Sequence, residues 1–185
     1  MATSLAQIAQ YLDNVQWRYQ IDRSQSRIHT RVKAQHVERF CITIELLEEG
    51  KFFQIYAPRL LSGVAQHPHR ELIFRTLLSL SWRTKMLKWE YDAIDGEVRA
   101  SIELPLEDAP LTQAQFSRIL SGFVQLVDRV AMPRIQAVMA TGTDPYDLEI
   151  GEKLLLFVQE RAPQGSLRAL ESALMRRKQE KLPST

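Results

Sequence analysis

The stretch His67-Pro68-His69 is the only histidine cluster in the sequence. Two histidines one residue apart point to the same side of a β-strand, where they can share a metal ion. Pro68, however, favours a turn or the first turn of a helix. No cysteine pair or close carboxylate completes a ligand set. We therefore interpret the stretch as a solvated helix start and predict no metal site.

Cys41 is the only cysteine, and therefore the only thiol nucleophile. A catalytic thiol needs a neighbouring base or positive charge that lowers its pKa, and no histidine stands in a defined relation to Cys41. Its place on the polar face of a predicted hairpin indicates a partly exposed structural thiol. Because a lone cysteine cannot form an intramolecular disulfide, we predict a reducing compartment and a cytoplasmic protein.

Two groups of carboxylates are candidates for acid–base catalysis. Carboxylates that act in this way need shifted pKa values, which require burial or close pairing. The predicted hairpins place one group on a solvated face and at a turn, and the other near a strand end. We therefore expect both groups to be solvated surface. The groups are Glu45, Glu48 and Glu49, and Glu103, Glu107 and Asp108.

The sequence contains none of the short motifs that carry phosphate-dependent, zinc-dependent or serine-nucleophile chemistry. GxGxxG, GxxxxGK[ST], HExxH and GxSxG are all absent, and seven glycines are few for a phosphate cradle. We predict a non-enzymatic protein without a cofactor. An enzyme whose site is assembled from distant residues is a remaining alternative, and a deep pocket lined by converging ionisable groups would indicate it.

The stretch Trp82-Arg83-Thr84-Lys85 combines an aromatic side chain with two cations between a predicted helix and a predicted hairpin. These residues could contact a partner or a phosphate. The preferred interpretation is that Trp82 closes the edge of the core while Arg83 and Lys85 are solvated, because tryptophan is usually largely buried. Tyr56, on the polar face of the first predicted hairpin, is a further candidate partner contact.

Positive charge is concentrated at the end of the chain. The net charge is +2, but the six basic and two acidic residues from Arg161 onward give that segment +4 and leave −2 for residues 1–160. Cations near a helix C-terminus suit the helix dipole without any ligand. Contact with nucleic acid or an anionic surface is the alternative, although few aromatic residues interleave with the charges. The candidate contacts are Arg176, Arg177, Lys178 and Lys181.

Residues 40–57 predict a first β-hairpin, because apolar and polar side chains alternate on both sides of the dipeptide Glu49-Gly50. Pairing Ile44 with Ile55 gathers the apolar side chains on one face, whereas a slip of one residue would mix the faces. Pro58 is expected to end the second strand, since proline cannot donate to the ladder.

Residues 87–104 predict a second hairpin around the turn dipeptide Asp95-Gly96. A two-residue turn puts Lys88 opposite Glu103 and Asp92 opposite Arg99. Opposite charges across antiparallel strands stabilise each other by roughly 0.2–1 kcal/mol per pair. The two charge pairs therefore favour this register.

Hydrophobic periodicity predicts the remaining elements, which are three helices and two short strands. A first helix begins after the cap residue Ser4, and a second covers residues 68–80. A capping box of Thr112 and Gln115 opens a long amphipathic helix. Pro133 is expected to kink or break that helix. Short strands are expected near residues 17–21 and 28–32.

The composition and element order predict a domain at residues 1–142 and a helical, basic extension at residues 143–185. In the extension we expect one helix around the apolar run Leu154–Val158 and another capped by Ser166. Hairpins with segregated helices imply an α+β fold: an antiparallel sheet with one face packed by helices. No apolar run approaches the roughly 20 residues that span a bilayer, and no signal peptide is expected.

The segment from Leu80 to Thr112, LSWRTKMLKWEYDAIDGEVRASIELPLEDAPLT, and the preceding hairpin ITIELLEEGKFFQIYAP resemble the bacterial YbjN-type proteins, described as candidate sensory-transduction regulators. The likeness covers roughly residues 5 to 142. It implies a fold similar to that of type III secretion chaperones, small α+β units that commonly form homodimers and bind extended or amphipathic segments of partner proteins. It implies no catalytic residues.

We therefore predict a protein-binding module, chaperone-like or regulatory, that acts as a homodimer. A partner strand could add to a sheet edge, or a partner helix could lie in a groove. The alternative is a nucleic-acid-associated protein that uses the basic tail, whose binding would weaken steeply with salt.

Overall fold

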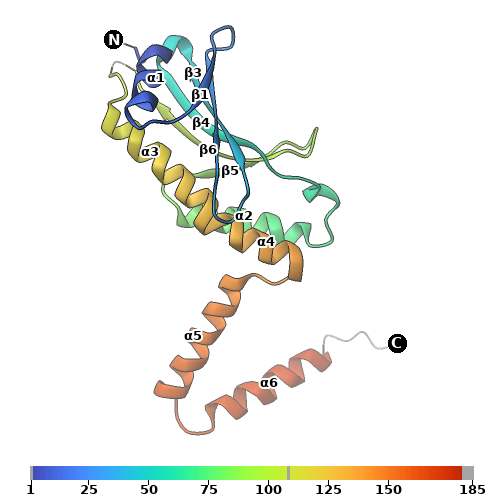
Figure 1. Cartoon of the computed structure of the whole chain (residues 1–185). Coiled ribbons are helices and arrows are strands. Elements are labelled where there is room, and N and C mark those ends of the chain that lie inside the picture. Colours follow the sequence, from blue (N-terminus) through green and yellow to red (C-terminus); the bar gives the residue numbers. More distant parts are fainter. Residues whose placement is uncertain (1, 108, 181–185) are drawn as a thin grey trace. The chain divides into compact units, whose positions relative to one another are not determined.

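The computed structural model describes residues 2–107 and 109–180 and divides into two compact units. One unit ends at Thr143 and the other begins at Asp144 (Figure 1). The N-terminal unit combines a sheet with helices, which confirms the predicted α+β class. Among the described residues, no helix has both the length and the apolar character needed to cross a bilayer.

The strands of the N-terminal unit form a six-stranded antiparallel sheet in the order β1-β2-β3-β4-β6-β5. Helix α2 (Arg70–Arg83) separates β4 from β5 along the chain, and β6 returns to pair with β4. The strands are β1 (Tyr19–Asp22), β2 (Arg27–Val32), β3 (Phe40–Leu47), β4 (Phe52–Leu61), β5 (Lys88–Tyr91) and β6 (Val98–Pro105).

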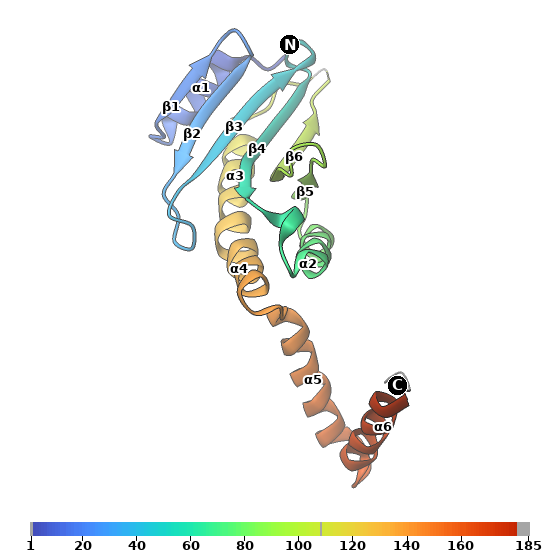
Figure 2. The ribbon, with the colours of Figure 1, turned by 90° about the vertical axis from the view of Figure 1, so that its right-hand side faces the viewer.

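Helices cover one face of this sheet, as predicted, and Figure 2 shows α1 (Leu5–Asn14) and α3 (Gln113–Gln125) behind the strands. The side chain of Ser4 accepts from the backbone N–H of Gln7 at 3.2 Å, which confirms the first cap. The capping box of Thr112 and Gln115 is also present. The helices are α1 (Leu5–Asn14), α2 (Arg70–Arg83), α3 (Gln113–Gln125) and α4 (Met132–Thr141).

The core lies between the sheet and the helices. Alternate residues of the central strands point toward the helices, so that Ile44 and Ile55 are fully buried. The Phe53 ring meets the Phe116 ring of α3 edge to face, with centroids 6.3 Å apart and an interplanar angle of 86°. Burying one such side chain contributes about 1.5–3 kcal/mol, so this layer ties the sheet to α3.

The first hairpin has the predicted register, with Ile44 opposite Ile55. Glu49 and Gly50 occupy its turn with φ values of 56° and 88°. Glycine is required at the second position for two reasons. Its φ is positive, and a Cβ atom there would lie 2.1 Å from the carbonyl oxygen of Thr3.

Pro58 does not end β4, contrary to the prediction. The strand continues to Leu61, and its pairing with β6 shifts between Ala57 and Leu61. Arg59, inside this irregularity, has a φ of 51°. A bulge leaves residues outside the hydrogen-bonded ladder, so the missing N–H of proline is tolerated there.

The predicted register of the second hairpin is wrong by two residues. Lys88 lies opposite Ser101 rather than Glu103, and Glu90 lies opposite Arg99. A shift of two residues keeps every side chain on its predicted face, because the side-chain period of a strand is two. The faces were therefore predicted correctly, while the cross-strand partners were not.

A longer turn causes this shift. The backbone N–H of Asp92 donates to the carbonyl of Glu97, and the Asp92 carbonyl accepts from Gly96, both at 2.9 Å. The loop therefore spans residues 93–96 instead of the dipeptide Asp95-Gly96 alone. The Asp92 carboxylate also accepts from the N–H of Ile94 at 2.8 Å, and such Asx turns stabilise the wider loop.

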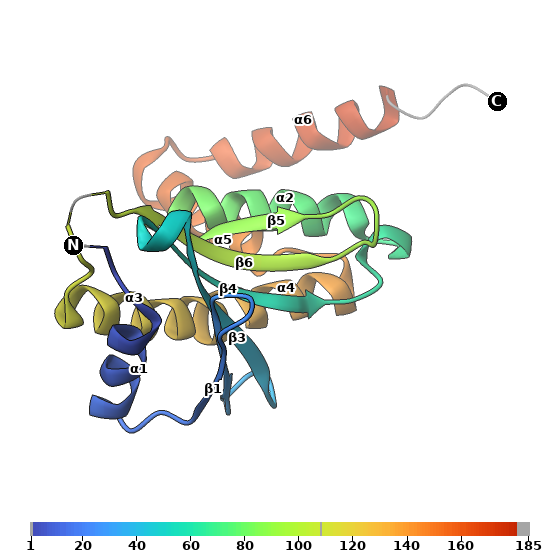
Figure 3. The same cartoon turned by 90° about the horizontal axis from the view of Figure 1, so that it is seen from above.

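Of the two predicted effects of Pro133, a kink or a break, the break of the long helix does not occur. The chain passes from α3 through a π-helical turn, Leu126–Ala131, into α4 (Figure 3). Pro133 then falls in the first turn of α4. The wider π turn re-routes backbone hydrogen bonds just before the proline, which lets helical conformation continue.

The π turn also positions a buried carboxylate. Asp128 accepts from the backbone N–H groups of Gln35 at 3.0 Å and His36 at 2.8 Å, in the loop between β2 and β3. The Gln136 side chain donates to the His36 carbonyl at 3.3 Å. The long helix therefore holds the β2–β3 loop through hydrogen bonds.

The C-terminal unit consists of two helices, α5 (Pro145–Arg161) and α6 (Ser166–Glu180). Asp144 caps α5 by accepting from the N–H of Tyr146 at 3.0 Å. Ser166 is the first residue of α6 rather than its predicted cap, and its hydroxyl donates to the Pro163 carbonyl at 2.7 Å. No residue of α5 is buried.

Candidate partner-binding surface

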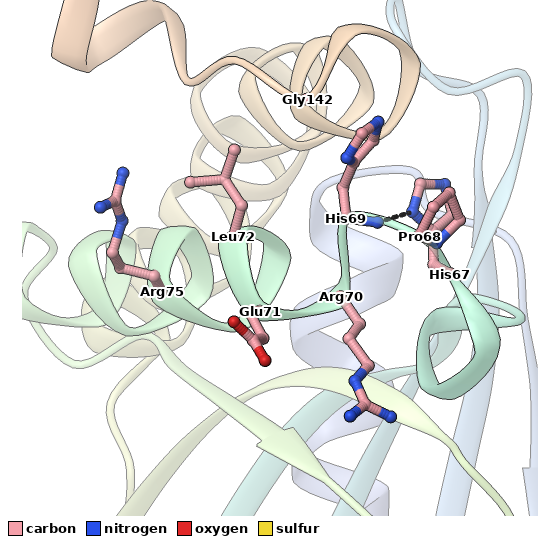
Figure 4. A pocket seen from close by; sticks show the side chains of 8 residues that line it. All are labelled: His67, Pro68, His69, Arg70, Glu71, Leu72, Arg75 and Gly142. Atoms are coloured by element: carbon pink, nitrogen blue, oxygen red, sulfur yellow. Dashed lines mark hydrogen bonds between the residues drawn. The ribbon is translucent and has the colours of Figure 1, made fainter. Parts of the chain in front are cut away.

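The histidine pair lines a hollow of about 470 Å³ at the start of α2, beside the end of α4 (Figure 4). The backbone N–H of His69 donates to Nδ1 of His67 at 3.1 Å, and the two ring centroids are 5.6 Å apart. That hydrogen bond occupies one of the nitrogen lone pairs a metal would need. Within the described part of the chain, no group of three potential ligands surrounds a metal position.

The contact between His69 and Gly142 gives this hollow a structural role. Gly142 ends α4 with a φ of 67°, and a Cβ atom there would lie 2.6 Å from Cε1 of His69. The histidine ring therefore packs directly on the backbone that terminates α4. The lining contains two cations, Arg70 and Arg75, and one carboxylate, Glu71, so the hollow carries charges of both signs.

A second hollow in the N-terminal unit is an apolar groove between α3 and the end of β6, with a volume of about 480 Å³. The backbone segment between α2 and β5 forms part of its wall. We call it the α3–β6 groove. It is lined by Lys85, Met86, Ile102, Leu104, Pro105, Leu106, Leu111, Gln115, Arg118, Ile119, Gly122, Phe123 and Leu126.

The charge on the α3–β6 groove is one-sided. Lys85 and Arg118 are exposed cations of the lining, and Gln115 adds an uncharged polar group. Among the described residues that line the groove, none is a carboxylate. An apolar floor with cationic edges favours an apolar segment that carries acidic side chains.

Local backbone geometry places one wall of the groove. The Thr84 hydroxyl donates to the Leu80 carbonyl at 2.8 Å where α2 ends. Met86 then adopts a φ of 70°, which turns the chain toward β5. The Met86 side chain remains 49% exposed. Methionine adapts its shape to varied apolar partners, which suits a binding surface.

On the sheet face that lacks helices, charged side chains of neighbouring strands form ion pairs with one another. Arg27 donates to Glu45 and Arg99 donates to Glu90, both at 2.8 Å. Burial lowers the pKa of Arg99, but the hydrogen bond that Arg99 donates to Glu90 and the nearby negative charges offset this effect and raise the pKa above its ordinary value. A partner docking on this face would have to replace these pairs, so the face is a poor docking surface.

Glu48, Glu49 and Glu107 are exposed, as predicted, whereas Glu45 and Glu103 differ from the prediction. Glu45 is buried rather than solvated, because long side chains of neighbouring strands lie across this face. Glu103 accepts from Lys88 and from Gln54, and the hydrogen bond from Lys88 lowers its pKa. A lowered pKa is the opposite of what a proton donor at neutral pH requires. Asp108 lies outside the described residues.

Trp82 does not close the core edge, contrary to the preferred interpretation. Its side chain is 90% exposed. The reason is that α2 extends through Arg83, so Trp82 lies in the last helical turn instead of the connecting segment. Arg83 and Lys85 are exposed as well, and of these three residues only Lys85 belongs to the α3–β6 groove.

Tyr56 is buried, and the Arg99 guanidinium lies over its ring at 5.0 Å from the centroid. The cation shields the face of the ring that a partner would otherwise meet. Tyr56 therefore belongs to the sheet face on which charged side chains pair with one another.

The basic residues of the chain end belong to the C-terminal unit, whereas the residues that line both hollows belong to the N-terminal unit. Arg176, Arg177 and Lys178 are exposed on the last turns of α6. Lys181 lies outside the described residues. No finding favours the nucleic-acid hypothesis over the helix-dipole interpretation of these charges.

The fold is similar to that of the crystal structure of YbjN from E. coli, a protein described there as a candidate transcription regulator. The two structures agree with a TM-score of 0.55 over 72% of this chain and 92% of that chain, at 13% sequence identity. This similarity confirms the predicted YbjN-like fold, and at such low identity it shows the fold alone.

Two further structures are more distant. The HopA1–SchA chaperone–effector complex matches at a TM-score of 0.49 and 10% identity, over 67% of this chain and 88% of that one. The ExsC–ExsE complex matches at a TM-score of 0.41 and 18% identity, over 66% of this chain and 89% of that one. Both similarities are too weak to support a conclusion. No protein-family model and no curated protein matches the sequence.

The groove itself was not predicted from the sequence. Helical periodicity places Ile119 and Phe123 on the apolar face of the long helix, which predicts burial and not a hollow. Gly122 was the available signal. A glycine inside a helix costs about 1 kcal/mol relative to alanine, and no heavy atom lies within 4 Å of the position its Cβ would occupy. It marks the place where α3 leaves space.

Proposed function

We propose that this protein is a non-catalytic binding module that receives an amphipathic helix of a partner protein in the α3–β6 groove. The observation that carries the proposal is the combination of an apolar floor with the exposed cations Lys85 and Arg118 at its edges. The matching partner presents apolar residues at helical spacing, flanked by Asp or Glu. The YbjN-like fold is compatible with this role but does not establish it.

A helix in the groove is preferred to a strand added at a sheet edge. The edge strands β1 and β5 each span only four residues. Short edge strands offer few unpaired backbone groups, and proteins use them to avoid edge-to-edge pairing. The groove, in contrast, offers apolar area that a helix could bury.

Trp82 is proposed as a second contact, outside the groove. A tryptophan that is 90% exposed is uncommon in a protein that acts alone, and tryptophan often dominates binding energy at interfaces. Arg83 is its neighbour in the last turn of α2. Both residues would contact the partner beyond the end of the bound helix.

The proposal includes a homodimer in a reducing compartment, the cytoplasm. The lone Cys41 is exposed, and an exposed thiol persists unmodified more readily where disulfides do not form. The dimer is supported by exposed apolar side chains of the C-terminal unit.

The test is a selection of helical peptides from a displayed library against the full chain. Gly122→Phe fills the groove and raises helix propensity, since the Cβ position is unobstructed. Ser121→Phe, at the adjacent exposed position of α3, adds the same ring outside the groove lining. Circular dichroism would verify that both variants fold.

We expect the selected peptides to carry apolar residues at i, i+3 and i+4 with acidic flanks. Gly122→Phe should weaken their binding at least about tenfold, and Ser121→Phe should leave it unchanged. Selected peptides that bind Gly122→Phe as tightly as the parent chain would overturn the assignment of the groove.

A further inference from the structure

The C-terminal unit exposes an unusual amount of apolar surface for its size. Helix α5 has no buried residue, and the two helices diverge from the turn at residues 162–165 (Figure 1). Two helices alone cannot enclose a core. The exposed apolar residues are Leu148, Ile150, Leu154, Leu155, Leu156, Phe157, Leu170, Leu174 and Met175. An apolar surface of this kind marks an interaction site.

The two helices carry opposite charge. Four acidic and two basic residues in 145–161 give α5 a net charge of −2. Four basic and two acidic residues in 166–180 give α6 a net charge of +2. A surface that pairs an acidic helix with a basic helix is complementary to a copy of itself turned by a two-fold rotation.

A glycine within the apolar side of α5 is a third observation. Gly151 lies one turn from Leu148 on one side and from Leu154 and Leu155 on the other, and nothing lies within 4 Å of its Cβ position. The monomer gains nothing from a glycine there, because glycine weakens a helix interior. A small residue does let a crossing helix approach closely.

From these three observations we infer that the α5–α6 unit is a self-association surface, which joins two copies of the chain with α5 of each against α6 of the other. Both apolar sides become buried, and the acidic and basic helices lie in contact twice. The inference specifies the dimer of the proposed function and rests on it. It does not depend on the α3–β6 groove.

The first arm of the test measures the mass of the full chain in solution by light scattering at about 50 µM, a concentration at which micromolar dimers are populated. Phe157→Asp and Leu174→Asp place charges on side chains that are 63% and 60% exposed in the single chain, so each monomer should still fold. Ile94→Asp, at a 96% exposed position of the second hairpin's turn, is the matched control.

We expect the parent chain and Ile94→Asp to be dimers, and Phe157→Asp and Leu174→Asp to dissociate at least about tenfold more readily. A monomeric parent chain would overturn both the dimer and this inference. A parent dimer that Phe157→Asp and Leu174→Asp leave intact would overturn this inference alone, since the two copies would then meet elsewhere.

The second arm uses charge. Glu152→Lys with Glu160→Lys changes α5 from −2 to +2, and Arg177→Glu with Lys178→Glu changes α6 from +2 to −2. Each double variant alone should dissociate, because both of its contacts then join helices of like charge.

A mixture of the two double variants restores opposite charges at both contacts. We expect mixed dimers to form more tightly than either double variant pairs with itself, and high salt to reduce the difference. If each double variant alone and the mixture of the two formed dimers equally tightly, the result would contradict the inference.

Discussion

At the scale of single residues, Asp128 shows how a charged side chain, of a type that usually lies on the surface, stabilises the fold when it is buried and hydrogen-bonded. Its carboxylate is buried in the π turn and accepts from the N–H groups of Gln35 and His36. Burial, the largest influence, raises the pKa of Asp128. The backbone hydrogen bonds of Gln35, His36 and Val37 together outweigh burial, so the pKa lies below its ordinary value of 3.8.

Asp128→Asn should lower the free energy of unfolding by about 1–3 kcal/mol at neutral pH, because a buried charge-assisted pair of hydrogen bonds is weakened. The lowered pKa gives the sign of the pH dependence. The stabilisation by Asp128 is present above pH 3.8 and is lost as pH falls through the lower pKa of the folded state.

Urea unfolding of the parent chain and Asp128→Asn across this pH range measures the effect. The gap between the two proteins should narrow as the solution becomes more acidic. A gap that widens on acidification would show that Asp128 is protonated in the folded protein, contrary to the hydrogen-bond geometry.

At the scale of elements, the second hairpin shows that charge pairs do not determine a register by themselves. Lys88 and Glu103 form an ion pair although they are not directly opposite, because long side chains reach diagonal neighbours. Arg99 pairs with Glu90 instead of Asp92. Registers two residues apart satisfy similar charge pairs, and the turn decides between them.

A double-mutant cycle tests this register. Glu90→Gln and Arg99→Gln should show a coupling free energy of roughly 0.2–1 kcal/mol. Asp92→Asn and Arg99→Gln should show none, although Asp92→Asn alone costs stability through its turn. The measurement is urea unfolding of each single and double variant. Coupling between Asp92 and Arg99, without coupling between Glu90 and Arg99, would support the register with a two-residue turn.

At the scale of the whole molecule, the two units differ in where their apolar side chains lie. Strands β3 and β4 hold fully buried residues such as Ile44 and Phe53, whereas α5 holds no buried residue. Local stability follows buried apolar contact, so the two units should open with different free energies. Self-association through the α5–α6 unit would raise the opening free energy of that unit and leave that of the N-terminal unit unchanged.

Hydrogen exchange followed by mass spectrometry measures this difference. In dilute protein, amides of α5 and α6 should exchange much faster than those of β3 and β4. Raising the protein concentration should slow exchange in α5 and α6 while leaving the central strands unchanged. Concentration-independent exchange in α5 and α6 would argue against their burial in a dimer.

Several features could be predicted from the sequence because they depend on neighbours in the chain. The register of the first hairpin followed from strict alternation around Gly50, since any odd slip would bury polar side chains. The caps at Ser4 and Thr112 followed from hydrogen bonds that span three residues. The YbjN-like fold followed from the resemblance carried by the two hairpins.

The candidate site could not be predicted in the same way. Amphipathic periodicity identified Ile119 as apolar, but not that α3 leaves a groove beside Leu104 of β6. Exposure of Trp82 depended on where α2 ends and which side faces the core. Both outcomes depend on the relative placement of elements distant in sequence, which local patterns do not contain.

The sequence by itself determined which faces are apolar, where the helices of the N-terminal unit are capped, and that the chain end carries positive charge. Only the tertiary structure decided which apolar faces find a partner within the chain. The N-terminal unit closes its core because helices cover its sheet, whereas α5 and α6 leave Phe157 and Leu174 in water. The physical reason is that burial requires a second surface, and whether one exists is decided in three dimensions.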